Sequence, residues 1–495
     1  MRSRIDALTG RVSMYRLATI TLSIVLAQAV LFGFLDVIGP DPYAILGTLG
    51  VVVVATVGAN EVAARLARVV PHRESSVITA LIITCIVQPS LTTVGLIAAA
   101  SAAILAALSK YLIVWHGRHL LNPASAGVLI AGFIGYYVSQ GVGFWWIATP
   151  ALLPAVAVGA LLLLHRTRRL DIGVIFIGLT IVIVGLRFVT TGTAPLDAVT
   201  TVLQLFPVVF LAGFMLSEPL TLPPRRWQQW LTAAVVAVAF SVPFGFGPIY
   251  TSPELALVIG NIVAFAVSRR SGFSLRIVDS APLSPFAIEY RFEPSRPLRF
   301  EAGQYLELHL PHATDIRGAR RMFSIASAPH RAAGAEGRRV AIGIRTPPGG
   351  SSFKAALATL EPGTRITATQ VAGDFVLPRD ASIPLVMIAG GIGVTPFASQ
   401  LASLAESGDQ RDIVIIVVSS NPGELLYREV LDSAGARIVE CTTEQLTPDA
   451  LRTIVPDLAK RRGYVSGAPS IVAAASTALR RAGARRVRTD YFTGY

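Results

Sequence analysis

Apolar runs long enough to cross a membrane fill the first half of the chain and stop at one point. They lie between Leu17 and Val267, and from Arg269 onward the sequence has the mixed composition of a water-soluble protein. A helix needs about 20 mostly apolar residues to cross a hydrocarbon layer. The chain is therefore predicted to contain a membrane α-helical domain, residues 1–270, followed by a soluble domain.

About ten transmembrane helices are predicted from these runs. The predicted spans lie near residues 17–35, 43–60, 76–89, 91–109, 124–139, 144–164, 172–190, 199–217, 228–245 and 253–268. Basic residues follow every second run, whereas the loops between them nearly lack Lys and Arg, with Arg187 as the exception. Cytoplasmic loops carry excess Lys and Arg. A multi-pass protein of the cell membrane is therefore expected, with both termini and the soluble domain in the cytoplasm.

A cleaved signal peptide is the alternative reading of the N-terminus. Arginines precede a short apolar run that ends in Ala27-Gln28-Ala29, and this pattern is also typical of a secretory leader. Cleavage there would leave the orientation of the remaining spans unchanged.

The net charge of +13 comes from arginines scattered between the apolar runs. Membrane loops explain this distribution better than a nucleic-acid surface, so no nucleic-acid partner is expected. The two cysteines are Cys85 and Cys441. A cysteine-ligated iron–sulfur cluster generally needs four, and no other metal site is predicted.

The soluble part divides into two predicted lobes. Residues 271–380 contain short alternating segments punctuated by Gly and Pro, a pattern typical of a small antiparallel β-barrel. Residues 381–495 alternate apolar strands with helical stretches, which predicts an α/β domain with a parallel sheet. Nucleotides bind at the carboxyl ends of the strands of such sheets.

A glycine turn follows the first strand of the α/β lobe. The strand that ends at Ala389 runs into Gly390-Gly391-Ile392-Gly393-Val394-Thr395-Pro396 and then into a predicted helix. Glycines let a backbone approach a pyrophosphate, and the helix N-terminus offers N–H donors. Gly390, Gly391, Gly393, Thr395 and Pro396 are therefore candidate cofactor-binding residues, with a plain tight turn as the alternative.

Five further motifs flank this turn. Gly303-Gln304-Tyr305 precedes Arg321-Met322-Phe323-Ser324, and Pro348-Gly349-Gly350-Ser351-Ser352 follows. An arginine suits a phosphate, an aromatic ring suits stacking on a flavin, and hydroxyls and backbone N–H groups suit the ring nitrogen and a second phosphate. Ser466-Gly467-Ala468-Pro469 and the terminal Asp490–Tyr495 complete the set.

In this order the motifs resemble the ferredoxin–NADP reductase superfamily across residues 272–495. The resemblance implies FAD on the barrel and NAD(P)H on the α/β lobe. Arg321 would hold the FAD pyrophosphate, Phe323 would stack on the isoalloxazine and Ser324 would lie at its reactive nitrogen. The remaining implied cofactor-binding residues are Tyr305, Gly350, Ser351, Ser352, Gly467 and Tyr495, and the implied catalytic residues are Ser324, Ser466 and Phe492.

Two residues depart from that family pattern. The family usually has Tyr where Phe323 stands, and Cys where Ser466 stands beside the nicotinamide. The segment Ser419-Ser420-Asn421-Pro422 also lacks the arginine that often holds a 2′-phosphate, so NADH is favoured over NADPH.

The membrane domain needs an electron carrier of its own if electrons are to cross it. The candidate haem ligands are His72, His116, His119 and His165. They lie in basic loops or outside the apolar runs, and no two spans carry matching midplane histidines. A haem is therefore not expected.

Flavin is the alternative carrier. Leu120–Gly127, Phe214–Pro223 and Glu254–Asn261 resemble segments of the Rnf complex D subunit and the sodium-pumping NADH:quinone reductase B subunit, over roughly residues 15–268. The resemblance implies FMN or riboflavin inside the membrane. Asn122 and Glu218 are polar groups at helix breaks or ends, where they would line a cofactor cavity, with a helix cap or a packing contact as the alternative for each.

Covalent attachment of that flavin stays open. The family motif ends in a threonine that takes FMN, but Ala194 stands there in Thr190–Asp197, and Thr193 is the nearest hydroxyl. Attachment through Thr193 and a non-covalent flavin in the same place are both retained as hypotheses.

The predicted function is transfer of electrons from cytoplasmic NAD(P)H, through FAD and a membrane flavin, to an extracytoplasmic flavoprotein or other acceptor. One alternative is reduction of a quinone within the bilayer, with or without sodium or proton pumping. Another is a transporter with a redox-sensing flavin domain. A transporter is expected to have charged residues within its spans. The predicted spans are almost free of them, apart from Glu61 and Glu254 near helix ends, which disfavours this alternative.

Overall fold

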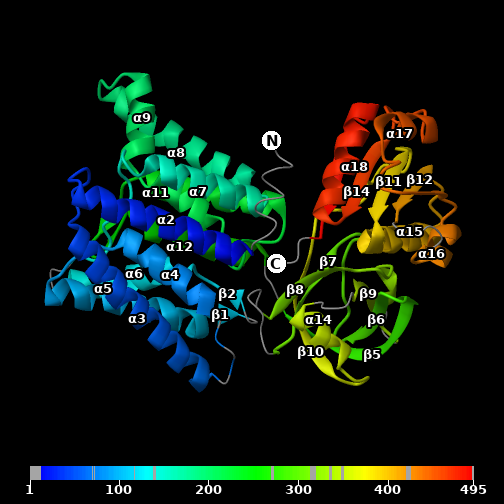
Figure 1. Cartoon of the computed structure of the whole chain (residues 1–495), viewed down its shortest axis with the longest axis horizontal. Helices are drawn as coiled ribbons and strands as arrows, with labels where there is room; N and C mark the ends of the chain where they lie inside the picture. The colour runs from blue at the N-terminus through cyan, green and yellow to red at the C-terminus, as the bar shows by residue number, and fades with distance from the viewer. Residues whose placement is uncertain are drawn as a thin grey trace. The chain divides into compact units, whose positions relative to one another are not determined.

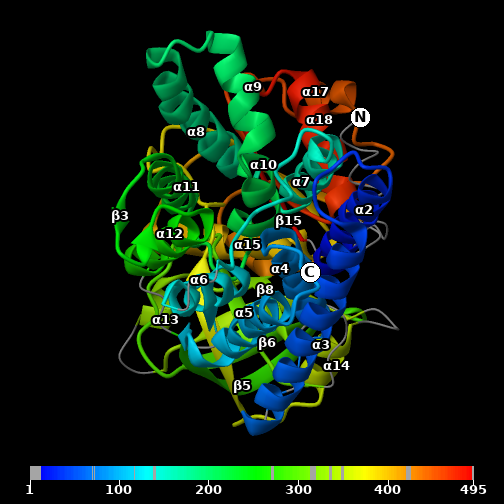
Figure 2. The same ribbon diagram turned by 90° about the vertical axis from the view of Figure 1, so that its left-hand side faces the viewer.

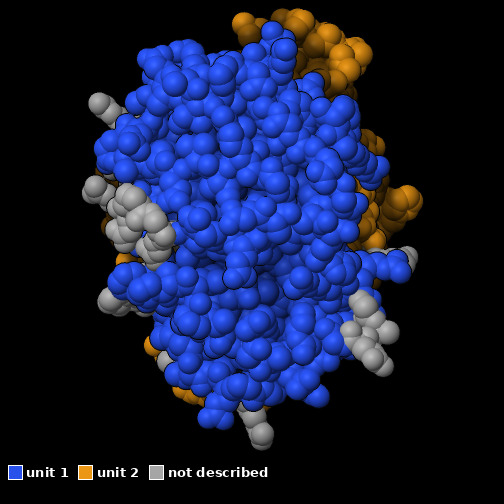
Figure 3. Space-filling view, turned by 90° about the vertical axis from the view of Figure 1, so that its right-hand side faces the viewer, with its two compact units in different colours: residues 1–7, 271–495 blue, residues 8–270 orange. Residues whose placement is uncertain are grey.

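The chain forms two compact units in the computed structural model, one covering Leu8–Arg270 and one that begins at Ser271. Figure 3 colours them orange and blue. The structure describes residues 13–67, 69, 71, 73–115, 118–137, 141–268, 272–312, 319–333, 337–346, 351–419 and 425–492.

The first unit is helical (Figure 1). Its helices are α2 (Met14–Phe34), α3 (Pro42–Leu66), α4 (Arg73–Ile86), α5 (Thr93–Leu112), α6 (Pro123–Tyr136), α7 (Leu153–Arg166), α8 (Leu170–Thr190), α9 (Pro195–Leu205), α10 (Val208–Phe210), the π-helix η1 (Leu211–Leu216), α11 (Arg226–Ser241) and α12 (Pro253–Ser268). Two small hairpins pair β1 (Val114–Trp115) with β2 (Arg118–His119) and β3 (Gly245–Phe246) with β4 (Ile249–Tyr250). Side chains of Ser13, Asp41, Thr92 and Asn122 cap the helices that follow them.

Fewer helices are long enough to span a membrane than the sequence predicts. Among the described residues, α2, α3, α5 and α8 are long and apolar enough, and the pair α9 and α10–η1 makes a fifth if it counts as one span. That pair is bent by 61°, and Pro207 stands at the break, where it cannot donate a backbone hydrogen bond. Figure 2 shows α9 returning beside α8.

The predicted span at residues 144–164 is wrong in its first half. α7 begins only at Leu153, with a proline in its first turn. The preceding segment is held as a loop, because the indole N–H of Trp145 donates to Glu254 Oε2 at 2.8 Å and that of Trp146 donates to the Thr84 carbonyl at 2.8 Å. Buried indoles need such partners, and these two tie the loop to α12 and α4.

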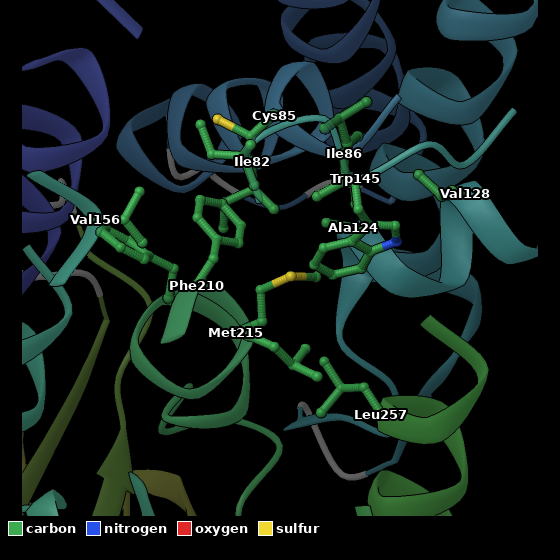
Figure 4. Close-up of a cluster of buried hydrophobic side chains, with 14 of the residues drawn as sticks. Ile82, Cys85, Ile86, Ala124, Val128, Trp145, Val156, Phe210, Met215 and Leu257 are labelled. Carbon is green, nitrogen blue, oxygen red and sulfur yellow. The ribbon is translucent and has the colours of Figure 1, made fainter. Parts of the chain in front are cut away.

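The core of the helical unit forms where several short helices meet. Figure 4 shows Ile82, Ile86, Trp145, Phe210 and Met215 directed toward one another. They come from α4, the loop before α7, α10 and η1, and each is no more than 8% exposed. Phe210 lies edge-on to Trp145, with ring centroids 6.2 Å apart. Burial of these side chains fixes helices that are too short to be stable alone.

The second unit contains two sheets. The first is antiparallel, in the order β8-β7-β10-β5-β6-β9. Its strands are β5 (Phe273–Ser284), β6 (Ala287–Pro294), β7 (Tyr305–His309), β8 (Arg320–Ser324), β9 (Val340–Arg345) and β10 (Arg365–Ala372), accompanied by α13 (His330–Ala333) and α14 (Ser352–Ala358). Alternate strand residues such as Leu306, Leu308 and Ile342 fill its core.

The second sheet is parallel, in the order β13-β12-β11-β14-β15. Its elements are β11 (Leu385–Gly390), η2 (Gly391–Val394), α15 (Thr395–Ser407), β12 (Ile413–Val418), α16 (Arg428–Ser433), β13 (Arg437–Cys441), α17 (Pro448–Ile454), β14 (Arg462–Gly467), α18 (Pro469–Ala482) and β15 (Val487–Tyr491). An antiparallel lobe followed by a parallel one confirms the predicted two-lobed soluble architecture.

Gly127 should be the packing point between α5 and α6. A Cβ at Gly127 would lie 2.4 Å from the Ala102 carbonyl oxygen, whereas one at Gly132, on the same helix, would meet nothing within 4 Å. We expect Gly127→Ala to destabilise the helical unit by about 1 to 3 kcal/mol, the usual cost of overpacking. Gly132→Ala should be neutral or stabilising. Thermal unfolding of both variants in detergent tests this, and equal melting temperatures would contradict it.

Candidate functional site

The glycine turn sits at the carboxyl end of β11. Gly391 has φ +54°, a conformation that suits glycine. A Cβ at Gly393 would lie 2.4 Å from the Ser466 carbonyl oxygen, and one at Gly390 would lie 2.8 Å from Ile471 Cγ2. Each glycine is therefore required by local geometry. Thr395 and Pro396 begin α15 directly after the turn, as predicted.

The Ser466 motif lies against this turn because β14 pairs with β11. Gly467 has φ +145°, and a Cβ there would lie 3.0 Å from the Gly390 carbonyl oxygen. The Ser466 side chain is fully buried, and its hydroxyl has no hydrogen-bond partner among the described residues. A buried hydroxyl without a partner is costly, so this geometry fits a polar group of a bound ligand.

β8 carries the predicted flavin-binding residues. Arg321 is 7% exposed, and its guanidinium carbon lies 5.5 Å from the centroid of the Phe353 ring. The half-buried Phe323 ring lies 5.7 Å from the same ring, at a tilt of 39°. The structure therefore gathers Arg321 and Phe323 around Phe353 of α14, an aromatic residue that the motif analysis missed.

The two predicted phosphate-binding serines begin α14. The Ser351 hydroxyl accepts a hydrogen bond from the Lys354 N–H at 3.4 Å and so caps the helix. Ser352 Oγ lies 3.0 Å from His312 Nε2. Gly350 belongs to the same motif but lies outside the described residues.

Ser324 contacts the C-terminal strand. It pairs with Tyr305 across β7 and β8, and its hydroxyl lies close enough to the Asp490 carboxyl of β15 to lower the pKa of that carboxyl. Burial raises the pKa of Asp490 to about 7, against the opposing effect of the Ser324 hydroxyl. Asp490 is also the register partner of Ser466 on β14. Residues of both lobes therefore meet at one place.

Asp490 is a site residue that the sequence interpretation did not single out. The sequence did contain an indication of its role, because Asp490 is the first residue of the terminal motif Asp490–Tyr495. The predicted catalytic residue Phe492 follows β15, and its backbone N–H donates to the Gly467 carbonyl at 2.9 Å, which places it beside the Ser466 motif. Tyr495 lies outside the described residues.

Asn122 and Glu218 are brought together in the helical unit. Asn122 caps α6, its side-chain amide donates to Glu218 Oε2 at 2.9 Å, and its backbone N–H donates to Asn261 Oδ1 at 2.7 Å. Asn122 and Glu218 line a pocket with Tyr15, Ser75, Thr79 and Ser217. Thr193 does not line it. Thr193 lies in the turn after α8, where its N–H donates to the Phe188 carbonyl.

Comparison with known proteins gives matches that concern the soluble unit. Residues 387–468 match the oxidoreductase NAD-binding domain family. The ferredoxin–NADP reductase B of Sorangium cellulosum is 32% identical over 197 residues, which are 39% of this chain and 75% of that protein. The reductase component 1 of terephthalate 1,2-dioxygenase from Comamonas is 28% identical over 226 residues, which are 42% of this chain.

The alignment spans 64% of the length of the Comamonas reductase component. Among solved structures, the cytochrome P450 reductase GcoB of Amycolatopsis is similar with 26% identity and a TM-score of 0.39, over 45% of this chain and 70% of that one.

Asp490 should make the soluble unit less stable at alkaline pH. Because folding raises the pKa of this carboxyl from 3.8 to about 7, the folded state binds the proton more tightly than the unfolded state. The resulting stability is present below the unfolded pKa and is lost as pH rises through the folded pKa. We expect Asp490→Asn to raise the melting temperature at about pH 8 and to leave it little changed at about pH 4.

The exposed Asp432 provides the control, since Asp432→Asn should have no such effect. Calorimetry of the full chain at both pH values is the measurement. Parallel pH profiles for wild type and Asp490→Asn would show that Asp490 is not the group responsible.

Proposed function

The C-terminal part of this chain belongs to the ferredoxin–NADP reductase family, and from this premise we propose that the enzyme passes electrons from NADH through FAD into its own helical unit. The chain is an NAD(P)H-dependent flavin oxidoreductase with a domain that binds FAD and NAD(P)H. The electron path beyond FAD is the proposed step.

One observation carries the proposal: Ser324 of the barrel meets Asp490 and the Ser466 strand end beside the glycine turn. A hydride donor on the α/β lobe and an acceptor on the barrel must meet where the two lobes contribute side chains. Here Ser324 of the antiparallel lobe and Ser466 of the parallel lobe are both neighbours of Asp490, the first through its hydroxyl and the second through strand register.

The described residues fit both cofactors. Arg321, Phe323, Tyr305 and the α14 serines would hold FAD, and Gly390–Gly393 with Gly467 would leave room for the pyrophosphate of NADH. The buried Ser466 hydroxyl offers a proton to the nicotinamide end. When bound, FAD accepts two electrons together and releases them one at a time, which joins hydride chemistry to one-electron transfer.

Ser324 and Asp490 supply the proton chemistry of the site. A carboxyl with a pKa of about 7 is populated in both protonation states near neutral pH. The Ser324 hydroxyl would then accept a hydrogen bond from the protonated Asp490 and donate its own proton toward the flavin, or donate to the ionised Asp490.

We further propose that the helical unit spans the membrane and binds FMN or riboflavin. The Asn122–Glu218 pair supports a polar ligand, because the two residues place an amide and a carboxyl in the lining of a pocket within an apolar unit. The same scheme includes three further proposals. Electrons would pass to an extracytoplasmic acceptor, the soluble unit would lie in the cytoplasm, and a flavin would be attached through Thr193. The competing proposal is quinone reduction, which is favoured by the mixed polar and apolar lining of this pocket.

Arg321→Ala and Ser324→Ala should impair different steps. Arg321→Ala removes the phosphate contact, so we expect loss of bound FAD. Ser324→Ala should keep FAD but slow its reduction by NADH roughly 100-fold, because the proton-exchange partner of Asp490 is lost. Stopped-flow bleaching of the flavin measures both. The control is Ser407→Ala at the end of α15, and wild-type rates in all three variants would refute the assignment.

Asn122→Ala in the full chain should reduce the content of FMN or riboflavin and leave FAD unchanged. The physical reason is that Asn122 both caps α6 and donates to Glu218 in the pocket. Chromatography of acid-extracted flavins measures each species. Thr193→Ala should abolish acid-stable flavin if attachment is covalent. Wild-type protein that contains only FAD would exclude the membrane flavin.

A further inference from the structure

His312 is a titratable residue that contacts one of the two serines at the start of α14. The ring follows β7, and both of its nitrogens are engaged. Nδ1 lies 2.8 Å from the Leu310 carbonyl oxygen, and Nε2 lies 3.0 Å from Ser352 Oγ. The ring also packs edge-on against Phe353, with centroids 5.6 Å apart. His312 is therefore held in a single orientation from two elements.

The chemistry of these partners sets the tautomer. A carbonyl oxygen only accepts, so Nδ1 must carry the hydrogen that is donated to Leu310. In the neutral ring Nε2 is then a bare acceptor, and the Ser352 hydroxyl donates its only proton to it. Ser351 differs, because its oxygen accepts from the Lys354 N–H and its own proton remains available to a ligand. In the neutral state only one of the two serines can donate to a phosphate.

We propose that His312 is a positioning residue that couples FAD binding to uptake of one proton, by releasing the Ser352 hydroxyl toward the FAD diphosphate. The proton comes from solvent and binds at Nε2. The imidazolium then donates to Ser352 Oγ, and the Ser352 O–H turns to the phosphate oxygen. No other bond is made or broken. This inference rests on the proposed placement of FAD at Arg321 and α14.

The charged groups that the structure describes near the ring are mainly cationic. On β7, His309 faces the same region, and its pKa is lowered to about 4 by burial, then by Arg320. Arg321 packs on the same Phe353 ring as His312, and Lys354 follows on α14, where it donates to the Arg345 carbonyl. Glu307 of β7 is the acidic group that acts on His309. A diphosphate would add negative charge to this mainly cationic surrounding.

The sign of the pH dependence follows from linkage. The bound anion stabilises the charged ring, so the FAD complex binds the proton more tightly than the free protein. FAD affinity should then rise as pH falls, by at most about tenfold per pH unit, the limit for uptake of one proton. The FAD diphosphate itself keeps a constant charge over this range.

FAD binding to the flavin-stripped full chain tests the proposal, with quenching of FAD fluorescence measured from about pH 5.5 to about pH 8.5, a range that brackets histidine titration. Wild type should bind FAD several-fold more tightly at the acidic end. His312→Gln should bind tightly and with no pH dependence, because its amide donates to Ser352 Oγ without a proton. Ser352→Ala should bind weakly and with a reduced slope. His330→Gln, an exposed histidine on α13, is the matched control and should keep the wild-type slope.

A flat wild-type profile, or an unchanged slope in His312→Gln, overturns the coupling while the FAD site stands if Arg321→Ala still loses FAD. Undiminished FAD affinity in Arg321→Ala overturns the proposed placement of the diphosphate, and the coupling with it. Retention of FAD by His312→Gln at acidic pH also shows that this variant is folded.

Discussion

The close backbone approach between the glycine turn and the Ser466 strand end is the constraint on which the reductase unit depends. A Cβ at Gly393 would lie 2.4 Å from the Ser466 carbonyl, and one at Gly467 would lie 3.0 Å from the Gly390 carbonyl. Two chain segments can pass so closely only without side chains. This contact sets the position of Ser466, and through the β14–β15 pairing it sets the position of Asp490.

Asp490 in turn links the two lobes through Ser324. Desolvation raises the pKa of the Asp490 carboxyl to about 7, and this is the property that a site of hydride and proton exchange needs. The acid–base chemistry of the site therefore depends on backbone packing. The glycine contact positions Asp490, and the burial of Asp490 and the hydroxyl of Ser324 set its pKa.

In the helical unit, polar side chains satisfy the backbone groups at helix ends. Its short helices end inside an apolar core, where unpaired backbone groups are costly. Asn122 satisfies the start of α6 and reaches Glu218 and Asn261, while Glu218 lies just beyond η1. Trp145 and Glu254 perform the same task for the loop before α7. Asn122 and Glu218, which lie at the first of these breaks, also line the pocket.

The sequence by itself determined the apolar and soluble halves, the antiparallel and parallel lobes, and the glycine turn at Gly390–Gly393. These features follow from local composition and period, which act over a few residues. It also indicated Arg321, Phe323, Ser324 and Ser466 as candidate site residues, whose roles remain to be tested.

Only the tertiary structure decided that Ser324 meets Asp490, that Ser352 meets His312, and that two predicted spans are broken. Hydrogen bonds between distant segments depend on strand register and lobe packing, which no local pattern encodes. The helix break before Leu153 is likewise stabilised by partners elsewhere in the fold, Glu254 and Thr84. The break at Pro207 stands at a proline, which cannot donate a backbone hydrogen bond. Hydropathy alone sees continuous apolar sequence at both places, because it does not register the hydrogen bonds that hold an irregular backbone inside a core.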